Sequence, residues 1–261
     1  MTAQPTGTFT PLPGSAPFAR QVLAQAGMEA RLLLRNGEQV LLAVVIPVIV
    51  LVGAVTGAEH LGLDLTHPPV DVFTPGVLAL AVMSTSFASL AIATGFERRY
   101  GVIKRLGASP LPRSGLLLGK VGALFLVELL QVLVVGAVGF ALGWDPVLDP
   151  EAIGSALLMV VLGTAAFAGL GLFLAGVLRA EATLAAANLV YLLLMAGGAI
   201  VLPASSYGAF GHVAVWLPSG ALGNGLRSAF VAGTLNVHSV AVLVVWSLVG
   251  AVLTARTFSW E

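Results

Sequence analysis

The chain of 261 residues contains no cysteine and few charged residues. The absence of cysteine excludes a disulfide framework, a thiolate metal site and a cysteine nucleophile. Only 9% of the residues are charged, against roughly 25% in an ordinary soluble domain. The 12 basic and 12 acidic residues balance, which argues against a nucleic-acid partner, because such a partner normally requires a basic surface.

Apolar residues make up 58% of the chain, and the mean hydropathy is +1.00. These values exclude a soluble globular protein and indicate several membrane spans.

Six long segments are free or nearly free of charge. They are Val40 to Val55, Phe73 to Thr94, Val121 to Leu142, Ile153 to Leu178, Ala182 to Leu202 and Val237 to Ala255. Backbone polar groups must be satisfied internally in a bilayer, so we expect each segment to be a helix. The segments lack the alternating polarity of barrel strands, which excludes an outer-membrane barrel. The predicted fold is an all-α membrane protein with six transmembrane helices in a single domain over residues 18–261.

The first 35 residues divide into two parts. Met1 to Pro17 is uncharged and rich in Pro, Thr, Gly and Ala, which predicts a disordered cytoplasmic tail. From Phe18 to Arg35, helical periodicity places apolar residues on one arc, although Gln25 and Glu29 intrude on it. Three arginines lie opposite this arc: Arg20, Arg31 and Arg35. We expect an amphipathic interfacial helix on the inner membrane surface, with its arginines toward lipid phosphates or a partner. The alternative is an ordinary leader into the first span.

The basic residues are divided very unequally between the two sides of the membrane. Of the 12, 11 fall on one side and Arg227 alone on the other. Because loops rich in Lys and Arg stay inside, this distribution places both termini in the cytoplasm. Arg is commoner than Lys, and Ala, Gly, Val and Leu dominate, which indicates a GC-rich bacterial genome. We therefore predict a multi-pass protein of the bacterial cytoplasmic membrane.

The segment between the last two spans, Pro203 to Asn236, is too apolar for a solvated loop. Pro203, Pro218 and several glycines interrupt it, so it cannot form a span. Irregular backbone is tolerated at membrane depth only when it packs against protein or lines a cavity. We expect one or two short re-entrant helices in the outer leaflet before the last span.

The loop after the second predicted span carries the most informative pattern. Half of the basic residues lie between Phe96 and Lys120. The pattern predicts a short helix from about Arg99 to Gly107, ended by Gly107 and Ser109-Pro110. The simpler interpretation is an inner loop that is merely basic, but the orientation rule does not require this density of Gly and Pro.

This loop resembles that of the type-2 ATP-binding-cassette exporter permeases. Their hallmark is Glu-Arg-Glu-x-Gly-Thr, then Leu, a small residue and Ser/Thr-Pro-Leu, and finally Gly-Lys at the start of the third span. The matching residues are Glu97, Arg98, Gly101, Leu106, Ser109, Pro110, Leu111, Gly119 and Lys120. Two residues depart from the pattern, since Arg99 replaces the second acid and Val102 the threonine. Further similarity extends over nearly the whole chain, at Leu32 to Asn36, Phe73 to Gly76, Leu217-Pro218 and Leu226-Arg227.

The resemblance implies that the loop, over about residues 97–113, is a coupling helix inserted into a groove of a separate cytoplasmic ATPase. The residues that it implies for this contact are Glu97, Arg98, Arg99, Gly101, Lys104, Arg105, Leu106, Ser109 and Pro110. It also implies a permease dimer, homo- or heterodimeric, with ATPase subunits that bind ATP and Mg²⁺. This chain has no phosphate loop of its own: Gly115 to Val121 has three residues between its glycines instead of four, and Val121 replaces the required Ser or Thr. We therefore expect no cofactor bound by the chain.

Glu128 is the only acidic residue inside a predicted span. A charged side chain at that depth costs on the order of 2.5–3.5 kcal/mol unless it has a partner, faces a cavity or is neutral. Gln131 lies on nearly the same helix face, and Ser84, Asn188 and Tyr191 are polar residues of other spans that could line the same path. These five residues are candidate substrate-path residues. Hydrogen bonding between helices that stabilises the bundle is an equally open interpretation.

The predicted function is a permease that exports an amphipathic or lipophilic substrate, such as a drug, an antibiotic or a lipid, because few charges face the membrane interior. Membrane lipids and the ATPase subunits are its expected partners. We expect neither a catalytic residue nor a metal site, because none of the four histidines has metal-site spacing. Two alternatives stay open: an intramembrane lipid-modifying enzyme that uses Glu128 as acid or base, and a membrane scaffold without transport activity.

Overall fold

The computed structural model describes residues 16–35, 37–61, 65–106 and 112–257, and these residues form helices and connecting turns without a strand. The elements are α1 (Phe18–Arg35), α2 (Gly37–Leu61), α3 (Pro69–Met83), η1 (Ser84–Ser89), α4 (Leu90–Arg99), α5 (Val102–Leu106), α6 (Arg113–Ala141), α7 (Pro150–Val177), α8 (Ala180–Gly197), η2 (Ala204–Phe210), α9 (Gly211–Ala214), α10 (Pro218–Ala232) and α11 (Val237–Thr257). The all-helical fold predicted from hydropathy is confirmed. Residues 1–15 of the expected tail lie outside the described part of the chain.

Five of the described helices are long and apolar enough to cross a membrane. They are Pro69–Arg99, Ser114–Ala141, Pro150–Val177, Ala180–Gly197 and Val237–Thr257. The first predicted span corresponds to α2, whose apolar part, Ala43–Ala58, is shorter than these five. The sixth span therefore stays a prediction.

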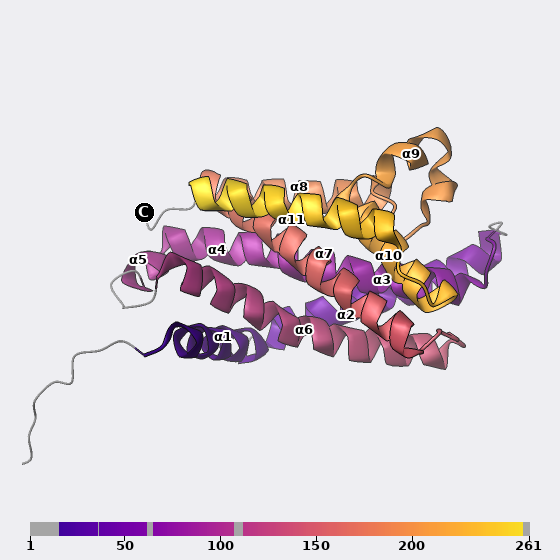
Figure 1. Ribbon diagram of the computed structural model, residues 1–261, viewed down its shortest axis with the longest axis horizontal. Helices are drawn as coiled ribbons and strands as arrows, with labels where there is room; N and C mark the ends of the chain where they lie inside the picture. The colour runs from indigo at the N-terminus through magenta and orange to yellow at the C-terminus, as the bar shows by residue number, and fades with distance from the viewer. Residues whose placement is uncertain (1–15, 36, 62–64, 107–111, 258–261) are drawn as a thin grey trace, which may run out of the picture.

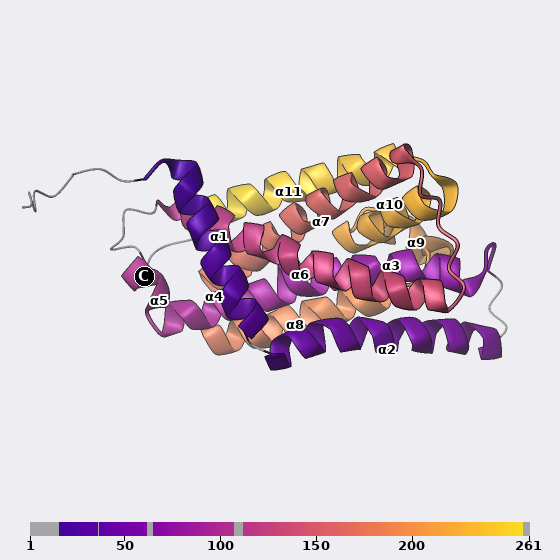
Figure 2. The same cartoon turned by 90° about the horizontal axis from the view of Figure 1, so that it is seen from below.

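The long helices run side by side in one bundle (Figure 1), and α1 crosses them at one end (Figure 2). The helix α5 and the C-terminal end of α11 lie at this same end, whereas α9 and the α6–α7 connection lie at the other (Figure 2). The exposed basic side chains of α1 and α5 are Arg20, Arg31, Arg35, Lys104 and Arg105. We call this end of the bundle the basic end.

The helix α1 has the bounds predicted for the interfacial helix, and its packed face coincides in part with the predicted apolar arc. Ala30 of that arc is buried, whereas Leu23 and Leu34 are 70% and 50% exposed. Gln25 is also buried, and Glu29 is only partly exposed. The two polar residues that interrupt the apolar arc therefore also turn toward the bundle.

Glycines of α6 explain this orientation. A Cβ atom on Gly119 would lie 2.5 Å from Cγ of Gln25, and one on Gly122 would lie 3.5 Å from Cβ of Ala26. Because these glycines have no side chain, α1 crosses α6 closely enough for short polar groups to meet.

The second predicted span extends beyond its expected end. The elements α3, η1 and α4 form one continuous helix, Pro69–Arg99, so Glu97 and the two following arginines lie in its last turn and not in a loop. Its middle segment η1 is a π-helix, in which Thr85 Oγ1 donates a hydrogen bond of 3.1 Å to Gln131 Oε1. Such π-helical turns inside α-helices are rare and are frequent at functional sites.

The helices α7 and α11 approach each other at two glycines. A Cβ on Gly169 would lie 2.9 Å from Cα of Gly250, and Thr254 Oγ1 donates to the Gly169 carbonyl at 2.8 Å. Small residues that let two backbones meet, with a hydroxyl hydrogen bond across the contact, are typical of helix pairs in membranes.

Replacing Gly250 by leucine should therefore separate α7 from α11 and lower the free energy of unfolding by about 1–3 kcal/mol, the usual cost of overpacking. The measurement is thermal unfolding in detergent micelles. Gly154→Leu is the matched control, because a Cβ on Gly154 of α7 meets no atom within 4 Å. Equal stability of the two variants would contradict this packing.

The fifth span is shorter than expected. Its helix α8 ends at Gly197 and not near Leu202, and the non-glycine residue Ala199 has φ +52°. The predicted short helices before the last span are present as η2, α9 and α10, of which α10 is mostly buried. Their depth in the membrane stays a prediction.

Arg227 of α10 binds the segment that follows α8. Its Nη2 donates to the carbonyls of Ile200 and Val201 at 2.5 and 2.8 Å, and its Nε donates to the Val72 carbonyl at 3.3 Å. The carbonyls of Ile200 and Val201 can accept these hydrogen bonds because both residues lie beyond the end of α8. Burial lowers the pKa of Arg227 to about 10, so the guanidinium keeps its charge at neutral pH. This arginine, expected alone on the outer side, ties α10 to α3 and to the segment after α8.

Candidate functional site

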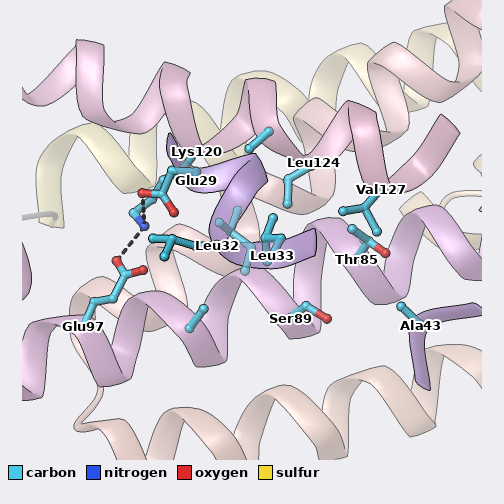
Figure 3. Close-up of a pocket in the computed structure, with 13 residues that line it drawn as sticks. Glu29, Leu32, Leu33, Ala43, Thr85, Ser89, Glu97, Lys120, Leu124 and Val127 are labelled. Carbon is cyan, nitrogen blue, oxygen red and sulfur yellow. Dashed lines mark hydrogen bonds and ion pairs between the residues drawn. The ribbon is translucent and has the colours of Figure 1, made fainter. Parts of the chain in front are cut away.

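Three charged side chains from three helices meet at the basic end. Lys120 of α6 is 3% exposed, and its Nζ lies 2.8 Å from Oε1 of Glu29 and 2.5 Å from Oε2 of Glu97 (Figure 3). Gln25 donates a hydrogen bond of 2.8 Å to the same oxygen of Glu29. We call Glu29, Glu97 and Lys120 the charge triad. A buried ammonium is stable only when ion pairs and hydrogen bonds replace its water, so the triad holds α1, α4 and α6 together.

The charge triad forms one end of a cavity of about 230 Å³, which we call the α1 cavity. Thr85 and Ser89 of η1 lie at its other end (Figure 3). Between these polar ends the walls are apolar. The apolar lining residues are Leu32, Leu33, Ala43, Leu90, Ala93, Ala123, Leu124 and Val127. The cavity is therefore amphipathic, with its charged end beside the first residue of the coupling motif.

The two arginines that follow Glu97 bind within the chain. Arg98 donates to the carbonyls of Ala175 and Gly176, in the latter case at 3.0 Å. These carbonyls lie in the last turn of α7, where backbone acceptors have no partner within the helix and favour a cation. Arg99 forms an exposed ion pair with Glu181, in the first turn of α8. Both arginines expected at the ATPase contact thus hold α4 to the α7–α8 connection.

The predicted coupling helix begins later than expected. It begins at Val102 and not at Arg99, because Tyr100 and Gly101 make a turn after α4. Ile103 is fully buried against Leu116, whereas Lys104 and Arg105 are exposed. Leu106 packs beside Ile103. The remaining predicted contact residues, Ser109 and Pro110, lie outside the described residues.

Gly101 makes this turn with φ +69°, a left-handed conformation that costs other residues about 1–2 kcal/mol. A Cβ there meets no atom within 4 Å, so the cost of Gly101→Ala comes from the backbone alone. We expect this variant to lose about 1–2 kcal/mol of stability, measured by thermal unfolding. Gly37→Ala, also in open space but without a positive φ, is the control. An unchanged Gly101→Ala variant would contradict the assigned turn.

The five candidate substrate-path residues make contacts with different elements, and their role in a substrate path stays a prediction. Glu128 is buried, and both its carboxylate oxygens accept a hydrogen bond from Thr164 Oγ1 of α7, at 2.9 and 2.8 Å. Gln131 faces α2, donating to the Ala43 carbonyl at 2.9 Å. The remaining three are on other elements: Ser84 and Tyr191 interact with each other, and Asn188 is exposed. Glu128 and Gln131 therefore join different pairs of helices.

The charge triad has no signal of its own in the sequence. Lys120 belongs to the family pattern but not to the predicted contact residues, and Glu29 interrupts the apolar arc of an amphipathic helix. Their ion pair joins residues 91 positions apart, which no local pattern indicates. Thr164, the partner of Glu128, had no sequence signal either.

Comparison with known proteins assigns the family. No curated protein matches the chain significantly. The family model described as ABC-2 type transporter matches residues 20–231, a segment that includes the charge triad, α5 and Arg227. The chain therefore belongs to the ABC-2 type transporter family.

Proposed function

We propose that this chain is the permease subunit of an ATP-binding-cassette exporter. It moves an amphipathic or lipophilic substrate out across the bacterial cytoplasmic membrane, with ATP and Mg²⁺ bound by a separate ATPase subunit. The observation that carries the proposal is α5, a short helix at the basic end of a membrane domain of this family. It is anchored by the buried Ile103 and presents the exposed Lys104 and Arg105.

The contacts of α5 and α4 suit them to transmit motion. Ile103 packs on Leu116, so a displacement of α5 reaches α6 directly. Through Glu97 and the charge triad it reaches α1, and through Arg98 and Arg99 it reaches the α7–α8 connection. Packed elements respond to such a displacement as rigid bodies. ATP-driven closure of the ATPase thus moves several spans through one small helix.

The proposed assembly contains two permeases, identical or different, and two ATPase subunits. Substrate passes between the two permeases. The basic end faces the cytoplasm, in line with the orientation rule for Lys and Arg, so both termini are cytoplasmic. Arg20, Arg31 and Arg35, exposed on α1, lie where they reach the phosphates of inner-leaflet lipids.

Affinity purification from native membranes in mild detergent tests this proposal. The variant carries Lys104→Glu with Arg105→Glu, two exposed charges of α5. The control carries Arg31→Glu with Arg35→Glu, which reverses two exposed charges of α1 at the same end. An ATPase subunit should be recovered with the wild type and the control and lost in the α5 variant.

Two results contradict the proposal. One is an equal loss of the ATPase from both double variants, which would show that α5 makes no specific contact with the ATPase. The other is normal membrane insertion with no ATPase recovered from any form. In that case a lipid-modifying enzyme or a scaffold is the better interpretation. Glu128→Gln then separates these two, because it abolishes lipid turnover only in the enzyme.

A further inference from the structure

We propose that the α1 cavity binds a compact amphiphilic cation, an amine that carries one aromatic ring or a short alkyl chain. The inference rests on the proposed exporter function, because it names the class of substrate and the place where it first binds. The α1 cavity combines three properties that such a ligand requires: a volume, an apolar wall and an excess of negative charge.

The volume of the α1 cavity fits a small organic molecule. A dry protein cavity of about 150 Å³ accommodates benzene, so the 230 Å³ of the α1 cavity holds a ring and a short substituted chain. Leucine, alanine and valine side chains make up most of the walls, and Thr85 and Ser89 bring hydroxyls to the end opposite the charge triad (Figure 3). Apolar pockets with a few placed polar groups are the usual form of small-molecule sites.

The charge of the lining selects a cation. Among the described residues that line the α1 cavity, Glu29, Glu97 and Lys120 are the charged ones, so the formal charge of this described lining is −1 when all three are ionised. Lys120 is ion-paired to one oxygen of each carboxylate. An ammonium group that enters can approach either carboxylate, whereas an anion meets two carboxylates and an ammonium already engaged. Opposite charge therefore favours an amine over a carboxylate or a phosphate.

The cavity also has an opening beside α1. Leu32 lines the cavity and is 59% exposed. Because α1 lies across the basic end (Figure 2), this opening is placed within reach of the inner leaflet. A ligand dissolved in that leaflet reaches the cavity along Leu32 without breaking the charge triad. Once bound, it lies beside Glu97, one residue before the arginines that hold α4 to the α7–α8 connection.

Equilibrium dialysis against the full chain in phosphatidylcholine nanodiscs tests this site. The probe is radiolabelled 4-phenylbutyl-trimethylammonium, with two matched compounds: the neutral isostere in which carbon replaces nitrogen, and the anion 5-phenylpentanoate. Empty nanodiscs of the same lipid give the background. The wild type should bind the cation saturably and at least tenfold more tightly than either matched compound.

Two variants identify the cavity. Glu29→Gln removes one negative charge and should weaken cation binding at least tenfold while leaving the neutral isostere unchanged. Ala93→Phe fills the cavity wall and should abolish binding of both. Its control is Ala165→Phe on the exposed side of α7, which should change neither. Because Ala93→Phe retains the charge triad, it tests the site even when Glu29→Gln does not fold.

The site is overturned by any of three results: no saturable cation binding to the wild type, equal binding to wild type and Ala93→Phe, or binding of the anion as tightly as the cation. The dialysis contains no ATPase, so its outcome is independent of the purification experiment. Saturable cation binding without a recovered ATPase keeps the site and rejects the exporter, and the converse result rejects the site alone.

Discussion

Replacing Lys120 by methionine should lower the free energy of unfolding by about 3–5 kcal/mol, the cost of removing one partner from a buried ion pair. Methionine is unbranched like lysine and one heavy atom shorter, so the change removes the charge with little loss of volume. Glu29 and Glu97 are left close together, both largely buried, with no cation between them. Thermal or denaturant unfolding in detergent micelles, at fixed detergent concentration, measures the loss.

The control for this prediction neutralises the whole charge triad. The triple variant Glu29→Gln, Lys120→Met, Glu97→Gln retains the shapes of the side chains and removes the uncompensated charge. Replacing a complete buried ion-pair set is often neutral, so the triple variant should recover most of the lost stability. Lys104→Met, at an exposed lysine, should change stability by no more than about 0.5 kcal/mol. A triple variant as unstable as the single one would mean that Lys120 acts through packing and not through charge.

Hydropathy predicted the helices because the bilayer leaves a long apolar segment one structure to adopt. Five of the six predicted spans correspond to described helices of sufficient length, and the bounds of α1 were also predictable. Periodicity did not predict that Gln25 and Glu29 of α1 turn toward the bundle, since it ranks residues by polarity alone. The position of Gly119 and Gly122 on the neighbouring helix decides that orientation, and a single helix contains no information about it.

The candidate functional site was less predictable than the helices, because its contacts also depend on how neighbouring helices pack. The family pattern around Glu97 marks the region, but it does not show that Arg98 and Arg99 bind the α7–α8 connection. Their partners are backbone carbonyls and one glutamate about 80 positions away, and such contacts exist only after the helices pack. The same holds for Arg227, whose acceptors are carbonyls that any sequence could supply. Polar contacts between backbone and side-chain groups that are far apart in the sequence are therefore the part of this fold that could not be predicted.

Replacing Arg227 by methionine should cost about 3–5 kcal/mol, because it leaves the carbonyls of Val72, Ile200 and Val201 without their donor. Each buried acceptor without a partner costs about 1–3 kcal/mol. The variant also no longer buries a charge, and this gain offsets part of the total cost of the unpaired carbonyls. The segment after α8 and the helix α10 then lose their hydrogen bonds through Arg227, so their attachment to α3 depends on packing alone. Unfolding in micelles measures the loss, and faster proteolysis between η2 and α10 locates it.

Arg227→Lys distinguishes the geometry of the guanidinium from its charge. A lysine ammonium keeps the charge and three donors, but it has no planar fork and cannot reach two adjacent carbonyls and a third on α3 in the same way. We expect the lysine variant to lose about half as much stability as the methionine variant and to show intermediate proteolysis. A lysine variant as stable as the wild type would show that charge alone holds this end. An equal loss of stability in both variants would show that the planar guanidinium of Arg227, and not its charge, makes the whole contribution to stability.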